Sequence, residues 1–155
     1  MRDDYGALTA ILRGAPSWAV AYSGGVDSSL VLRCAADAVG AENVMALTFA
    51  SPLHPLRESR EAAEFVSSLG VEFEIVNANP LEIPEVAGNR RDRCYHCKRK
   101  LFSALIAAAG TRGITRIADG TNADDPGVYR PGLRAVEELG VFSPLREAEI
   151  GRAHV

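Results

Sequence analysis

Apolar residues along the chain follow two patterns in turn. Short, nearly continuous apolar runs predict buried strands, and they lie at 17–23, 43–49, 71–78, 115–121 and 141–145. Apolar residues at helical spacing predict helices between most of these runs, at 27–39, 57–70, 94–109 and 132–139. Strands that alternate with helices pair in parallel through right-handed crossovers. The pattern therefore predicts an α/β fold with a doubly wound parallel sheet of about five strands and helices on both faces.

Single residues within the helical segments refine this picture. Gly70 stands where the second helical segment should stop, because glycine readily adopts the left-handed conformation that ends helices. Cys34 falls on the apolar stripe of the first helical segment, together with Val31 and Ala35. Because free cysteine behaves as a small hydrophobic residue, we expect Cys34 in the core.

Composition and charge limit the class of protein. A chain of 155 residues that is 47% hydrophobic can bury one good core, which predicts a single globular domain. The net charge of −3 gives no broad positive field, which argues against nucleic acid or an anionic membrane as partner. No run approaches the roughly 20 apolar residues of a membrane helix, and the N-terminus carries acids where a signal peptide is basic. We expect a cytoplasmic protein without a membrane partner, and a homo-oligomer stays open.

The segment AYSGGVDSSLVL, residues 21–32, carries the first chemical signal. Gly24 and Gly25 join a predicted strand to a predicted helix, where glycine permits positive φ and exposes successive N–H groups. The start of the next helix adds unpaired donors and a partial positive charge, which suits phosphate oxygens. The segment lacks both the G-x-G-x-x-G dinucleotide motif and the lysine of G-x-x-x-x-G-K-[ST]. The alternative is a glycine turn that only connects two elements.

The sequence SGGVDSS at 23–29 resembles the PP-loop of the ATP pyrophosphatase, or adenine nucleotide α-hydrolase, superfamily. Members of that superfamily cleave ATP between the α and β phosphates. The resemblance implies that the loop holds the pyrophosphate leaving group and that Asp27 is a catalytic residue near Mg²⁺. The residues implied in pyrophosphate binding are Ser23, Gly24, Gly25, Asp27, Ser28 and Ser29.

A second segment, DGTNADDPGVYRPGLRAVEELGVFSPL at 119–145, narrows the family. The chain from about Leu8 to Glu147 resembles the ATP-dependent sacrificial sulfur transferases of the LarE family, which act in nickel-pincer cofactor biosynthesis. The resemblance implies that ATP adenylates a carboxylate of a pyridinium mononucleotide and that sulfur then replaces the adenylate.

Several residues of this segment are candidates for binding. Gly120 and Thr121 end the fourth strand on the same sheet edge as the first loop, and Asp124 with Asp125 could bind a metal or a ribose. Arg130 is a candidate for the substrate's phosphate or carboxylate, because a guanidinium can bind either in a bidentate manner. The alternative for Arg130 is a solvated loop arginine.

The third segment, NRRDRCYHCKRKLF at 89–102, contains paired cysteines. Cys94 and Cys97 are three residues apart at a predicted helix start, so both sulfurs can lie on one face and reach a common metal. Some LarE-family members sacrifice one cysteine sulfur, whereas others hold a [4Fe-4S] cluster with a third cysteine, and RCYHCK resembles the cluster type. His96 lies on another face, so we do not expect it to be a ligand. The alternatives are cysteines without a ligand role and a basic face that is merely solvated or touches RNA.

The end of the chain departs from the family, whose members continue into a further region with another cysteine. The last residues, IGRAHV at 150–155, resemble a translated sequencing adapter. We therefore expect a truncated PP-loop domain at 1–149 followed by a non-native tail. Three rivals remain, namely a tRNA thiolation enzyme, an ammonia-using synthetase of the NAD or GMP synthase type, and a non-catalytic ATP-binding fragment.

Overall fold

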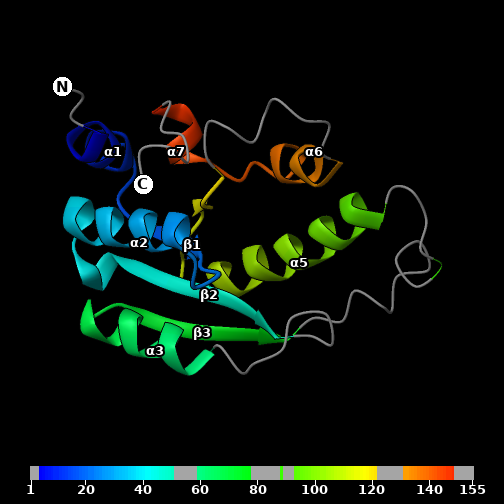
Figure 1. Ribbon diagram of the computed structural model, residues 1–155, viewed down its shortest axis with the longest axis horizontal. Helices are drawn as coiled ribbons and strands as arrows, with labels where there is room; N and C mark the ends of the chain where they lie inside the picture. Colours follow the sequence, from blue (N-terminus) through cyan, green and yellow to red (C-terminus); the bar gives the residue numbers. More distant parts are fainter. Residues whose placement is uncertain (1–3, 51–58, 78–87, 89–92, 122–130, 149–155) are drawn as a thin grey trace.

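A central parallel sheet organises the protein (Figure 1). The computed structural model describes residues 4–50, 59–77, 88, 93–121 and 131–148. The strands are β1 (Trp18–Ala21), β2 (Val44–Ala50), β3 (Glu72–Asn77) and β4 (Ile117–Ala118). The helices are α1 (Asp4–Leu12), α2 (Val26–Val39), the 3₁₀ turn η1 (Ala41–Asn43), α3 (Ser59–Ser68), α5 (Arg93–Gly110), α6 (Pro131–Glu138) and α7 (Pro144–Glu147).

The strand order confirms the doubly wound fold. The four strands lie in the order β3-β2-β1-β4, and all neighbours pair in parallel. The chain first builds outward from β1 to β3 and then crosses back to place β4 on the other side of β1. Strand order therefore reverses between β1 and β4, which is where ligands bind in folds of this kind.

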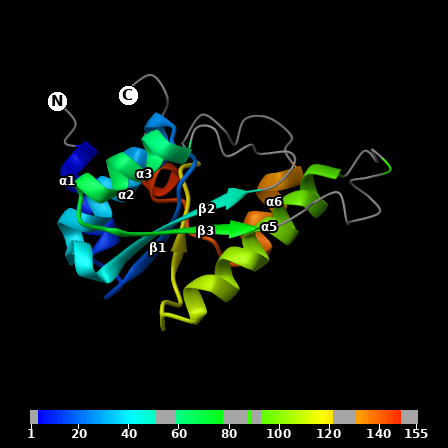
Figure 2. The ribbon, with the colours of Figure 1, turned by 90° about the horizontal axis from the view of Figure 1, so that it is seen from below.

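Alternate residues of the strands fill two separate apolar layers. On one face, Trp18 and Val20 of β1 pack in a core with residues of α1, α2, α3 and α7. On the other face, Ala19 of β1 packs with Met45 and Leu47 of β2 against residues of α5 and α6. Figure 2 shows α5 and α6 on the opposite side of the sheet from α2 and α3. Helices on both faces bury most of β1 and the first four residues of β2, which explains the nearly continuous apolar sequence of these two strands. The edge strand β3 is less covered, and its Ile75 is 40% exposed.

The fifth predicted strand, at 141–145, is reduced to one bridge. Phe142 pairs in parallel with Ala118, and the chain then enters α7 at Pro144. Proline has no N–H for a strand ladder, and its fixed φ suits the first turn of a helix. The predicted strand at 115–121 is likewise shorter, since β4 contains only Ile117 and Ala118.

Other details of the prediction are confirmed. Cys34 is fully buried in the core between α2 and the sheet. Gly70 follows α3 with a φ of 73°, the left-handed conformation expected after a helix. Within the described ranges, no helix combines the length and the apolar character that crossing a bilayer requires.

Candidate functional site

Two loops meet where the strand order reverses. Ser23 follows β1, and Gly120 follows β4, which pairs directly with β1. A Cβ on Gly120 would lie 2.8 Å from the backbone nitrogen of Ser28 and 3.2 Å from the carbonyl carbon of Asp27. The loop after β4 thus packs against the backbone of the first turn of α2. The two motifs that the sequence singled out at 23–29 and at 120–121 therefore lie against each other.

The glycine turn opens the start of α2 to solvent. Gly24 has a φ of 86°, in the region that favours glycine. Gly25 is the N-cap of α2, and no side chain caps the helix there. Ser23, Gly24 and Gly25 are exposed, and Val26 is 63% exposed. An uncapped, exposed helix N-terminus next to successive glycine amides is suited to bind an anion.

Serine hydroxyl groups form hydrogen bonds within this turn. Ser28 is buried, and its Oγ accepts the backbone N–H of Ser23 at 3.1 Å. The Oγ atoms of Ser23 and Ser28 lie 3.0 Å apart, and Ser23 Oγ also accepts the N–H of Gly25 at 3.3 Å. Ser29 Oγ donates to the carbonyl of Gly25 at 2.7 Å. The hydroxyls of Ser28 and Ser29 therefore maintain the shape of the loop, and Ser23 has the exposed hydroxyl.

Asp119 organises the opposite side of the site. Its side chain is buried at 6% exposure, and its Oδ1 accepts the N–H of Thr121 at 3.2 Å and the hydroxyl of Ser143 at 2.7 Å. The hydroxyl of Thr121 donates to Oδ2 at 2.9 Å. Sequence reasoning missed Asp119, although an acidic residue directly after a buried strand and before Gly-Thr was a usable signal.

The remaining predicted ligands of the nucleotide are placed only in part. Asp27 lies half-buried in the first turn of α2, directly after the glycine turn. Its carboxylate is the oxygen ligand that Mg²⁺ prefers, so the residue type fits the predicted role. Asp124, Asp125 and Arg130 lie outside the described residues.

The paired cysteines lie at the start of α5, as predicted. Cys94 and Cys97 belong to the first turns of the helix, and Cys97 is half-buried. The side chain of Cys94 lies outside the described part of the chain. Among the described residues, no three His, Cys, Asp or Glu side chains converge as a metal site. A cluster would therefore need a further ligand from elsewhere, since two cysteines complete neither zinc nor iron–sulfur coordination.

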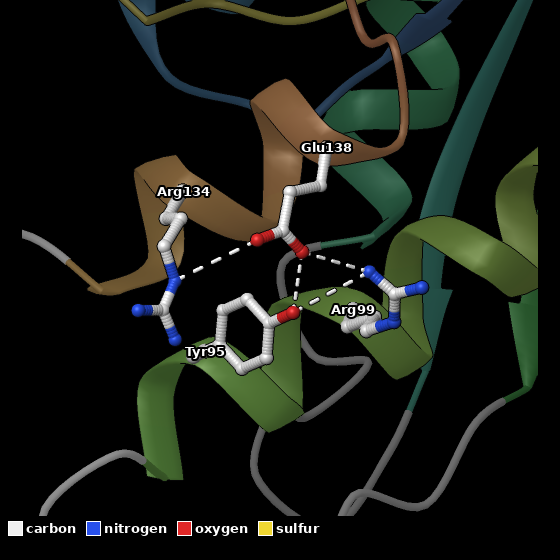
Figure 3. A network of polar contacts seen from close by, with 4 residues as sticks. All are labelled: Tyr95, Arg99, Arg134 and Glu138. Atoms are coloured by element: carbon white, nitrogen blue, oxygen red, sulfur yellow. Dashed lines mark hydrogen bonds and ion pairs between the residues drawn. The ribbon is translucent and has the colours of Figure 1, made fainter.

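A polar network fixes the cysteine-bearing turn to α6 (Figure 3). Tyr95, which lies between the two cysteines, donates its hydroxyl to Glu138 Oε2. Arg99 Nη1 lies 3.0 Å from the same oxygen, and Arg134 Nε lies 3.7 Å from Oε1. The guanidinium of Arg134 also lies over the Tyr95 ring, 4.3 Å from its centroid. The start of α5 thus has a defined position on α6.

Comparisons with known proteins agree with this geometry. A family model described as NAD synthase matches residues 12–94. An uncharacterized protein of Synechocystis sp. is 39% identical over 136 residues, which cover 88% of this chain and 50% of that protein. Pyridinium-3,5-bisthiocarboxylic acid mononucleotide synthase of Lactiplantibacillus plantarum is 34% identical over 148 residues, which cover 96% of this chain and 54% of that protein. The chain spans about half the length of these curated relatives.

Solved structures show the same fold. The glutamine-dependent NAD⁺ synthetase of Acinetobacter baumannii, solved in complex with adenosine diphosphate, superposes with a TM-score of 0.76 at 20% identity. The superposition covers 97% of this chain and 31% of that chain. At this identity the likeness concerns the fold alone, and it confirms the Rossmann-like architecture.

Proposed function

The chain belongs to the NAD synthase family of the PP-loop superfamily, and we propose that it is the ATP-binding part of an ATP-dependent sulfur transferase. The observation that carries the ATP site is the contact of Gly120 with the first turn of α2, which joins both motifs at the reversal of strand order. The sulfur-transfer reaction is supported by the 34% identity, over 96% of the chain, to a synthase of a pyridinium bisthiocarboxylic acid mononucleotide.

In the proposed first step, an oxygen of a substrate carboxylate attacks the α phosphorus of ATP. The bond from the α phosphorus to the bridging oxygen breaks, and pyrophosphate leaves with the electron pair. Amides at Gly24, Gly25 and the start of α2 stabilise the charge that develops on the leaving group, as fixed dipoles do in an oxyanion hole. The exposed hydroxyl of Ser23 adds a donor at the same place.

Asp27 is the residue that would hold Mg²⁺, which supplies charge neutralisation of the phosphates when bound. In the second step, a sulfur nucleophile attacks the acyl carbon and AMP leaves. Hydrosulfide gives the thiocarboxylate directly, whereas a cysteine gives a thioester that releases the thiocarboxylate when the Cα proton is lost and the Cβ–Sγ bond breaks, which leaves dehydroalanine. Cys94 and Cys97 are the candidates for supplying sulfur or for holding an iron–sulfur cluster with a further ligand.

A second candidate is an ammonia-using synthetase. It is favoured by the match of residues 12–94 to a family model described as NAD synthase. The first step is shared, because ammonia also attacks an adenylated carboxylate. The two reactions differ only in the nucleophile, so the nature of the product separates them.

The test measures pyrophosphate and phosphate release when this chain is incubated with ATP and a pyridinium carboxylate mononucleotide. We expect pyrophosphate, AMP and, with a sulfur source, a thiocarboxylate detected by mass spectrometry. Ser23→Ala should reduce the rate, and the matched control Ser103→Ala, an exposed serine of α5, should not. Release of phosphate in place of pyrophosphate would contradict the α–β cleavage, and an amide product with ammonia would select the second candidate.

A further inference from the structure

The hydroxyl of Thr121 uses its proton in a hydrogen bond within the protein. It donates to Asp119 Oδ2 at 2.9 Å. A carboxylate only accepts hydrogen bonds, so the single proton of this hydroxyl points at Asp119. Any group that contacts Thr121 Oγ1 from the solvent side therefore meets a lone pair and must itself be a donor.

Two further hydrogen bonds fix the Asp119 side chain, so Thr121 remains the donor in its hydrogen bond with Asp119. Its Oδ1 accepts a backbone N–H, from Thr121, which cannot reverse its polarity. The same oxygen accepts the hydroxyl of Ser143 at 2.7 Å. Ser143 is the N-cap of α7, yet its side chain does not cap that helix and instead contacts Asp119. The arrangement gives up a local stabilisation of α7 in order to fix the carboxylate.

On the other side of the site, the exposed hydroxyl of Ser23 can be a hydrogen-bond donor to a ligand. Ser28 Oγ accepts the N–H of Ser23, so its own proton points to Ser23 Oγ at 3.0 Å or to the carbonyl of Gly25 at 3.4 Å. When Ser28 is the donor to Ser23, the Ser23 hydroxyl keeps its own proton available for a ligand. Phosphate oxygens are acceptors at neutral pH, so Ser23 suits phosphate and Thr121 does not.

We propose that Asp119 is a positioning residue that makes Thr121 Oγ1 an acceptor for a donor group on the nucleoside part of ATP. The donor is a ribose hydroxyl or the exocyclic amine of adenine. Thr121 follows Gly120, which touches the first turn of α2, so it lies beside the phosphate-binding turn but outside it. Ser23 acts as a hydrogen-bond donor to the phosphates and Thr121 as an acceptor from the nucleoside, and together they orient the nucleotide. This inference rests on the proposed ATP site.

The test compares the binding of ATP, 2′-deoxy-ATP, 3′-deoxy-ATP and inosine triphosphate by calorimetry. Wild-type protein should bind one of the three analogues about five- to tenfold more weakly than ATP, the effect of one hydrogen bond. Thr121→Val should lower this preference to within about twofold, and Thr121→Ser should retain it, because serine keeps the hydroxyl. The affected analogue identifies the donor group.

Asp119→Asn adds a sharper test. Its amide oxygen must take the place of Oδ1, which accepts a backbone N–H, so its NH₂ group faces Thr121. Thr121 must then accept from Asn, and its proton turns outward. We expect the preference for ATP over the affected analogue to disappear, while the affinity for inorganic pyrophosphate stays within about twofold.

The outcomes separate this inference from the proposed function. Wild-type protein that binds ATP and all analogues equally well would overturn the inference but leave the ATP site. A retained preference in Thr121→Val would overturn it as well, even if Asp119→Asn does not fold. Wild-type protein that binds neither ATP nor pyrophosphate would overturn the proposed function and the inference together.

Discussion

Alanine at position 120 tests the contact on which the site depends. Gly120 does not adopt a left-handed φ, so only space requires a glycine here. A Cβ would lie 2.8 Å from the backbone nitrogen of Ser28 and 3.1 Å from its Cα, whereas ordinary contact begins at 3.4 Å. Both atoms belong to helix backbone and cannot rotate away. The loop after β4 must therefore move from α2 by about 0.6 Å, an overpacking that costs about 1–3 kcal/mol.

We expect the Gly120→Ala protein to unfold at a temperature lower by about 3 °C for each kcal/mol lost. The affinity for ATP should fall about tenfold or more, since a charge-assisted hydrogen bond contributes about 1.5–3 kcal/mol. Gly110→Ala at the end of α5 is the matched control, because a Cβ there meets nothing within 4 Å. Thermal unfolding and calorimetric titration with ATP measure both quantities. Wild-type stability and affinity in Gly120→Ala would refute the contact.

Three further substitutions, a labelling experiment and a pH dependence follow from the geometry. Gly24→Ala places a side chain at a φ of 86° and should cost about 1–2 kcal/mol in urea unfolding and also weaken ATP binding. Gly113→Ala, at a φ of 74° away from the site, should cost similar stability and leave ATP binding unchanged. Glu138→Gln should lower the unfolding free energy by at most about 1 kcal/mol, and less at high salt, because its partners are exposed. A larger or salt-independent loss in that variant would show that the network does more than surface ion pairs do. Burial raises the pKa of the Cys34 thiol to about 11, so iodoacetamide at pH 8.5 should label half-buried Cys97 and spare Cys34 until urea is added. Because the unfolded thiol ionises at its ordinary, lower pKa, the unfolding free energy should fall as the pH rises toward 11. Equal labelling of both thiols in native protein would contradict the burial of Cys34.

Local patterns in the sequence predicted most elements correctly. The helix at 94–109 is α5, and of its predicted apolar face Phe102, Leu105 and Ala109 are buried, whereas Ile106 is partly buried. The N-terminal helix α1 was not predicted, although Leu8 and Leu12 are spaced by one turn and fully buried. The apolar periodicity of α1 is weak, because one of its three buried residues is the polar Thr9 and because Gly6 interrupts the helix with a poor helix former. The apolar run at 141–145 is predicted as a strand, whereas only Phe142 pairs with the sheet and α7 begins at Pro144.

The sequence predicted that the two motifs of the candidate site lie on the same edge of the sheet, but not which atoms of the two loops are in contact. The sequence indicated that Ser23, Gly24 and Gly25 form a turn and that Gly120 and Thr121 end a strand. It did not reveal that Asp119 joins the loop after β4 to Ser143, because the hydrogen bonds cross from one element to another. The predicted ligands Asp124 and Arg130, and the tail at 150–155, stay predictions outside the described residues.

The sequence by itself determined the glycine turn, most of the helices and strands and the parallel sheet, because φ preference and apolar periodicity act between residues near one another in the chain. The tertiary structure decided that Gly120 lies against the first turn of α2 and that Thr121 points its proton at Asp119. It also decided that α6 holds the cysteine-bearing start of α5. These contacts depend on strand order and on the packing of distant segments, and no local spacing in the sequence encodes them.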